Sequence, residues 1–252
     1  MKLNSSRLRI HLARGMLLAS LGTLSVHADY QSTVLSQGPA GYWRLNETAP
    51  AQAPITNAVN LGSLGTAGTY EGSQGFFRGF PGALANSGTA VHFDGSSQDV
   101  LVPYNAALNP STFSIEGWLY ADAAAANCAL SCGDFGNPRA GWLIYQTGGT
   151  GYELRMYKGG GTAVAANPVG NVGNVVGVYT HVVATFDGTT ARIYLNGVLS
   201  ASDVPNAPYL PGVSGPFTIG ERADTGFRWS GKADEVAYYN TALSPSVIAA
   251  HY

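Results

Sequence analysis

The side chains of this chain that are best suited to acid–base chemistry are its carboxylates. Enzymes that cleave glycosidic bonds use two carboxylates, about 5 Å apart when configuration is retained and about 6.5–9.5 Å apart when it is inverted. Because side chains alternate along a strand, two acids share a face only at even spacing. Asp234 and Glu235 are adjacent and are expected on opposite faces, and nothing selects Glu116 and Glu153 as a pair across strands. The sequence therefore predicts no catalytic pair and a protein that is not an enzyme.

Asp94 and Asp99 flank a turn in the stretch His-Phe-Asp-Gly-Ser-Ser-Gln-Asp-Val, residues 92–100. Calcium takes about six to eight oxygen ligands, many from loop carboxylates and carbonyls, and these two residues are candidate ligands. Short carboxylates also accept hydrogen bonds from backbone N–H groups in tight turns without any metal. The sequence supports the calcium site and the plain turn about equally.

Aromatic rings and one arginine near predicted loops are candidates for ligand contact. Ligand sites combine apolar ring faces with a few polar groups, an arrangement that suits sugars. The candidates are Trp142, Tyr145, Tyr152, Tyr157, Arg228 and Trp229. Tyr and Trp also fill the cores of β-sandwiches, so burial is the alternative for each ring.

Two cysteines, Cys128 and Cys132, stand close together in a stretch that we expect to be a loop. In an oxidising compartment such thiols pair, and the small loop that they close gives modest stabilisation. A metal-binding pair is the alternative, but no second Cys or His pair occurs at zinc spacing. The sequence predicts a local disulfide.

Residues 1–28 differ in character from the rest of the chain. A basic head precedes an apolar run of about twelve residues and the small-residue sequence Val-His-Ala, the pattern of a secretory signal that ends at Ala28. The basic residues of the head are Lys2, Arg7, Arg9 and Arg14. A membrane anchor is the alternative, but a span needs about 20 apolar residues. We expect a secreted or cell-surface domain over residues 29–252.

The charge balance argues against nucleic acid as a partner. The chain has 13 Lys+Arg and 15 Asp+Glu, and without the predicted signal 9 basic residues face 15 acidic ones, a formal charge of −6. Nucleic-acid binding requires clustered positive charge. The acidic excess leaves carboxylates available for a cation such as calcium.

Patterns typical of β-strands dominate the chain. Along residues 112–120 successive side chains alternate between the two faces of a strand, and both faces carry bulky residues. This is typical of a central strand covered by a second sheet. Residues 181–186, 191–195 and 198–202 are separated by Asp-Gly and Asn-Gly, which suit tight hairpin turns. These features predict an all-β, two-sheet antiparallel jelly-roll sandwich.

The last residues, 231–252, combine two periods. Residues 233–240 alternate like a strand, and Ser244 followed by Pro245 predicts the cap and first residue of a helix. The motif Gly-x-x-Asp-Glu-Val-x-x-Tyr-Asn-x-Ala-Leu-Ser of this segment, together with Tyr-Trp-Arg-Leu at 42–45, resembles the laminin G-like (LamG) domains of the concanavalin A-like lectin/glucanase superfamily. The resemblance extends over residues 42–252.

The resemblance implies a concanavalin A-like fold in which Asp234 supports a calcium site or a structural hydrogen-bond network, with Asp94 as a second contributor. The Glu-x-Asp-x-Glu signature of laminarinase-like enzymes is absent. We expect a non-catalytic, lectin-like module with a glycan as its partner and calcium as its candidate cofactor. The alternatives are an adhesive domain that binds extracellular proteins and a glycoside hydrolase of the same superfamily.

Overall fold

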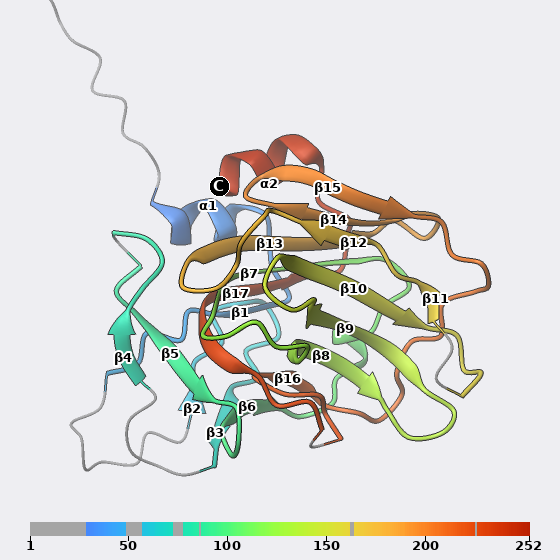
Figure 1. Cartoon of the computed structure of the whole chain (residues 1–252), viewed down its shortest axis with the longest axis horizontal. Coiled ribbons are helices and arrows are strands. Elements are labelled where there is room, and N and C mark those ends of the chain that lie inside the picture. The colour runs from blue at the N-terminus through green and yellow to red at the C-terminus, as the bar shows by residue number, and fades with distance from the viewer. Residues whose placement is uncertain (1–28, 49–56, 73–77, 86, 162–163, 225) are drawn as a thin grey trace, which may run out of the picture.

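The computed structural model describes residues 29–48, 57–72, 78–85, 87–161, 164–224 and 226–252. In this part of the chain two antiparallel sheets pack against each other and enclose one large apolar core (Figure 1). The predicted all-β sandwich is confirmed. The predicted signal, residues 1–28, lies outside the described residues.

The eight-stranded sheet has the order β15-β14-β13-β7-β17-β5-β4, with β1 paired to β17. Its strands are β1 (Gly41–Trp43), β4 (Arg78–Pro81), β5 (Thr89–Asp94), β7 (Phe113–Ala121), β13 (Tyr179–Phe186), β14 (Ala191–Leu195), β15 (Val198–Asp203) and β17 (Ser230–Tyr239). The predicted three-stranded hairpin unit is confirmed as β13, β14 and β15.

The nine-stranded sheet has the order β11-β10-β9-β8-β16-β6-β3-β2, with β12 paired to β10. Its strands are β2 (Asn57–Ala58), β3 (Gly68–Glu71), β6 (Asp99–Val102), β8 (Cys128–Asp134), β9 (Ala140–Gln146), β10 (Gly151–Tyr157), β11 (Val164–Ala166), β12 (Val169–Asn171) and β16 (Phe217–Ile219).

Two short α-helices, α1 (Tyr30–Ser36) and α2 (Pro245–His251), cover part of the outer face of the eight-stranded sheet, and one 3₁₀ turn spans Ala106–Leu108 (Figure 1). The Ser244 hydroxyl caps α2 by accepting from the Val247 N–H at 3.3 Å, as the Ser-Pro sequence predicts. Among the described residues, neither α-helix has the length and hydrophobicity needed to span a bilayer.

The two ends of the domain meet in the eight-stranded sheet. Strand β1 pairs with β17 so that Tyr42 lies opposite Ala237, which joins the Tyr-Trp segment to the closing segment. This strand pair explains why two motifs about 190 residues apart belong to one fold.

The prediction of a disulfide is wrong. Both cysteines are free and buried, because the stretch expected to be a loop is strand β8. Cys132 lies four positions after Cys128, roughly 13 Å away along an extended strand, whereas a disulfide needs Cα atoms about 4.4–6.8 Å apart. A register shift after Cys128 also places it on the outer face, while Cys132 packs into the core.

Candidate functional site

One row of half-buried side chains crosses the part of the eight-stranded sheet that the described helices leave uncovered. It comprises Phe80, His92, Lys232, Tyr120 and Tyr179, which lie on the neighbouring strands β4, β5, β17, β7 and β13. We call it the cross-sheet row. At the usual spacing of strands the row is roughly 19 Å long.

Strand register builds the row. Lys232 lies opposite both His92 and Tyr120, and Tyr120 lies opposite Tyr179. Their chain neighbours Val91, Ala233 and Leu119 point into the core, so the period of two turns the row outward.

The aromatic rings of the row contact each other and a cation. Tyr120 and Tyr179 meet edge to face at 5.3 Å, and Phe80 lies 5.1 Å from the His92 ring. The Lys232 Nζ lies 3.5 Å from the centroid of Tyr120 and 5.9 Å from that of Phe80. These contacts fix the ammonium on the aromatic surface.

Polar groups border the row. Asp122 Oδ2 lies 2.6 Å from His92 Nε2 and accepts a hydrogen bond from the Ser230 hydroxyl at 2.7 Å. The Tyr179 hydroxyl donates to the Pro81 carbonyl at 2.9 Å. The result is an apolar ring surface edged by hydrogen-bonding groups.

The helices do not extend over this row. Two residues farther along β7, Trp118 is covered by the rings of Tyr30 and Tyr252, at 6.4 and 5.8 Å. The row therefore lies directly beside the part of the sheet that the helices cover. The sequence analysis does not predict this row, because the only signal for it is the register between strands, which the sequence alone does not determine.

A bulge corrects the prediction that Asp234 and Glu235 face opposite ways. Strand β17 gains an extra residue between Asp234 and Ala237, and Glu235 has a φ of 54°. Asp234 accepts from the Ser87 hydroxyl at 2.8 Å, while Glu235 pairs with Arg44, whose guanidinium donates to the Ser87 carbonyl. Both carboxylates thus lie on the same side of the sheet, but both are fully buried and unable to reach a substrate.

Glu116 and Glu153 do not meet, because they lie in different sheets. Glu116 is fully buried beneath the helices, where it accepts from the Tyr239 hydroxyl at 2.6 Å and lies 2.9 Å from His251 Nδ1. Burial alone would raise the pKa of Glu116, but hydrogen bonds with His181 and His251 outweigh it and lower the pKa to about 2. This network fastens α2 to the sheet.

The predicted ligand-contact residues are distributed between the core and the outer face of the nine-stranded sheet. Trp142, Tyr152 and Trp229 are fully buried core residues, so the prediction that they present rings to a ligand is wrong. Tyr145 and Tyr157 lie on the outer face of the nine-stranded sheet, 7% and 2% exposed. Arg228 is partly exposed and lies near Glu221 and Asp99.

The three predicted calcium ligands are not brought together. Asp94 accepts from the Ser96 and Ser97 N–H groups in its turn, Asp99 belongs to the nine-stranded sheet, and Asp234 belongs to the eight-stranded sheet, where it accepts from the Ala83 N–H. No group of three or more His, Cys, Asp or Glu in the described part of the chain is arranged to hold a metal. These residues do not fit a shared calcium site.

A second acidic group surrounds Arg228, whose guanidinium lies 3.0 Å from Glu221 Oε2 and 3.9 Å from Asp99 Oδ1. Burial, together with the charge of Glu71, raises the pKa of Asp99 to about 6. Burial and the charge of Asp99 raise the pKa of Glu221 to about 7. Both carboxylate side chains are only 4% exposed, which leaves little access for a substrate.

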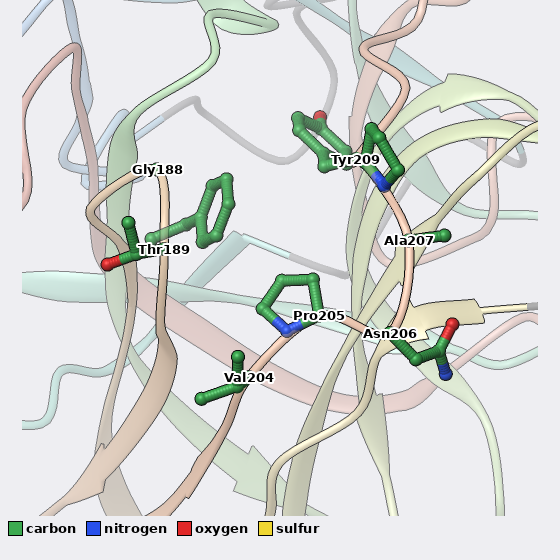
Figure 2. Close-up of a pocket in the computed structure, with 9 residues that line it drawn as sticks. Gly188, Thr189, Val204, Pro205, Asn206, Ala207 and Tyr209 are labelled. Carbon is green, nitrogen blue, oxygen red and sulfur yellow. The ribbon is translucent and has the colours of Figure 1, made fainter.

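A separate pocket of about 420 Å³ lies between the β13–β14 turn and residues 204–209. Figure 2 shows Gly188 and Thr189 on one wall and Pro205, Val204 and Tyr209 around the remainder. Its wall includes Phe186, seven residues beyond Tyr179 on β13, so the pocket lies roughly 23 Å from the row. Its lining is mostly apolar and contains no charged side chain.

Comparison with known proteins identifies the family and the fold. The family model described as the concanavalin A-like lectin/glucanases superfamily matches residues 94–249. Among curated proteins, none matches the sequence significantly.

Solved structures with this fold include three binding or accessory domains. The binding domain of Paraclostridial Mosquitocidal Protein 1 has a TM-score of 0.63 and 15% identity, covering 85% of this chain and 52% of that one. The binding domain of Botulinum Neurotoxin DC, in complex with SialylT, has a TM-score of 0.61 and 13% identity, covering 85% and 51%. This chain therefore spans about half the length of either toxin domain.

Domain 4 of AbnA, a GH43 extracellular arabinanase from Geobacillus stearothermophilus in complex with arabinotriose, has a TM-score of 0.59 and 17% identity. The match covers 84% of this chain and 97% of that domain. At these identities the likeness establishes the fold alone.

Proposed function

This chain belongs to the concanavalin A-like lectin/glucanase superfamily, and on that basis we propose that it is a secreted, non-catalytic module that binds carbohydrate on the cross-sheet row. The observation that carries the proposal is the row itself: aromatic rings on neighbouring strands, bordered by hydrogen-bonding groups.

The chemistry of the row suits a saccharide. Sugar rings have apolar C–H faces that pack on aromatic side chains, and hydroxyls that need donors and acceptors at the edges. Phe80 and Tyr179 supply ring surfaces, the Tyr120 ring holds the Lys232 ammonium in place as a donor, and Asp122 supplies an acceptor. Since these side chains lie on a hydrogen-bonded sheet, binding would require little ordering.

Two structural relatives were solved with saccharides, the arabinanase domain with arabinotriose and the neurotoxin domain with SialylT. They support carbohydrate as the ligand class and leave the sugar open. Secretion rests on residues 1–28, whose sequence predicts a signal.

A glycoside hydrolase is the weaker candidate. The fold is shared with enzymes, and Asp99 and Glu221 are close carboxylates with raised pKa values, as general acids require. Their burial beside Arg228 opposes that role. Loss of any measured hydrolysis in Asp99→Asn and Glu221→Gln variants would support an enzyme.

A glycan array tests the proposal. We expect the unsubstituted protein to bind a defined set of glycans and Tyr120→Ala to bind the same glycans much more weakly. Asn206→Ala, which alters the pocket of Figure 2, is the control and should bind normally. Silence of the unsubstituted protein across the array would favour an adhesive domain with protein partners.

A further inference from the structure

The outer face of the nine-stranded sheet carries an exposed aromatic ring, Phe227, packed against a buried one. Phe227 is 48% exposed, in the loop between β16 and β17, next to Tyr145 of β9. We call the surface formed by Phe227, Tyr145, Arg155, Arg222 and Arg228 the Phe227 face.

Phe227 is held in an unfavourable backbone conformation. Its φ is 55°, in the left-handed region that bulky residues avoid. The Cys128 N–H donates to its carbonyl at 2.9 Å, and the Arg222 N–H donates to the Gly226 carbonyl at 3.0 Å. Two residues on, the buried Trp229 donates to the Gln146 side chain at 2.7 Å. Surrounding contacts therefore impose the strain, which is characteristic of ligand-binding positions.

The ring of Phe227 is also oriented before any ligand arrives. The Arg222 guanidinium lies 4.4 Å from its centroid, and Tyr145 meets it edge to face at 5.8 Å. Arg155 lies 4.2 Å from the Tyr145 centroid on the same surface. An exposed ring held this way loses little conformational entropy on binding.

The charges of the Phe227 face are paired internally. Arg222 forms two hydrogen bonds with Asp224, at 2.6 and 2.7 Å. Arg155 pairs with Glu153, and Arg228 pairs with Glu221. Each arginine of the face therefore has a carboxylate partner, and the polar groups around the ring favour a neutral polyol with an apolar side over a free anion.

We infer that the Phe227 face is a second saccharide site, so that one domain binds two glycan chains from opposite sides of the sandwich. The inference takes its ligand class from the proposed function. The cross-sheet row lies on the outer face of one sheet and the Phe227 face on the outer face of the other. Because packed sheets are about 10 Å apart, one short glycan cannot reach both sites.

The test is binding and precipitation of soluble arabinan, xylan, galactan and polygalacturonate by the monomeric protein, checked as monomer by light scattering. Retardation in native gels containing each polysaccharide reports binding, and turbidity reports cross-linking. The variants are Tyr120→Ala, Phe227→Ala, the double variant and Tyr104→Ala, a control that removes a ring 38% exposed elsewhere. Circular dichroism confirms that each variant is folded.

We expect each single variant to remain bound to the polysaccharide that the unsubstituted protein binds, with apparent affinity lower by on the order of 10²-fold and without turbidity. The double variant should show no retardation. If Phe227→Ala retards and precipitates like the unsubstituted protein, the second site is wrong and the proposed function stands. If the unsubstituted protein binds none of the four and is silent on the glycan array, both proposals are wrong.

Discussion

The Lys232 ammonium lies 3.5 Å from the centre of the Tyr120 ring, and the two residues are direct neighbours on strands β17 and β7. This pair is the middle of the cross-sheet row. It links the closing segment of the chain to the central strand, so the segment that identifies the family also supplies the centre of the candidate site.

The cation–π contact of Lys232 should contribute to stability. Lys232→Met keeps the aliphatic stem and removes the charge, so the free energy of unfolding should fall by about 0.5–1 kcal/mol. Lys232→Arg keeps a cation over the ring and should match the unsubstituted protein. Urea denaturation measures both, and equal stability of all three proteins would show that the contact contributes nothing.

Stability should be greatest in mildly acidic solution. Burial raises the pKa of Asp99 to about 6 and those of Glu221 and Asp234 to about 7. Between pH 7 and about 4.5 the native state therefore holds protons that the unfolded chain has released, so lowering the pH stabilises the fold. Glu116, with a pKa of about 2, has the opposite effect below pH 4.5.

Melting temperatures between pH 3 and 8 test this profile. We expect a rise from pH 8 toward about 4.5 and a fall below it. The double variant Asp99→Asn/Glu221→Gln should flatten the rise, whereas Asp187→Asn, at an exposed ion pair, should not. A melting temperature that falls steadily from pH 8 to 5 would contradict the assignment.

The two thiols should be unreactive in the native protein. Cys128 and Cys132 are fully buried, and burial raises the pKa of both thiols far above that of a free cysteine. A thiol reagent should detect no thiol in the folded protein and two in denaturant. Dithiothreitol should leave the melting temperature unchanged. A lower melting temperature in dithiothreitol would show that the two cysteines form a disulfide after all.

The strain at Phe227 can be measured with two small substitutions. Phe227→Gly and Phe227→Ala both remove the ring, but only Ala keeps a Cβ in the left-handed region. The Gly variant should be more stable than the Ala variant by about 1 kcal/mol. Equal stability of the two variants would mean that the loop relaxes freely and that the backbone at position 227 is not strained.

Calcium stays a prediction that thermal melting can test. If a structural calcium is bound, excess chelator should lower the melting temperature by several degrees, and added calcium should restore it. Because Asp94, Asp99 and Asp234 lie apart, a calcium ion bound by any one of them should be lost when that residue alone is replaced by Asn, while the other two single variants keep their response to chelator. An unchanged melting temperature in excess chelator would show that no calcium ion stabilises the fold.

Local patterns were enough to predict most of the fold. Alternation along residues 112–120 and the Asp-Gly and Asn-Gly turns gave the correct strands, and Ser244-Pro245 gave the correct helix start. Strand β8 was missed because its small residues, buried on both faces, look like a loop when tertiary packing is unknown.

The candidate site was much harder to predict. The row depends on the register between β5, β17 and β7. The sequence around Lys232 and His92 does not reveal which residues of the other strands they pair with. The bulge at Glu235 likewise breaks the alternation that assigned Asp234 and Glu235 to opposite faces. Large rings such as those of Trp142 and Trp229 are suited to ligand contact, but their large apolar area also favours burial, and both are buried in the core.

The most direct test of carbohydrate binding on the cross-sheet row is a titration of ¹⁵N-labelled protein with the glycan that binds most strongly on the array, monitored by amide chemical shifts. If the cross-sheet row binds the glycan, the largest shifts occur at His92, Tyr120, Tyr179 and Lys232, and Tyr120→Ala abolishes them while Asn206→Ala does not. Shifts confined to the pocket of Figure 2, or to α1 and α2, with the four row amides unmoved, would contradict it.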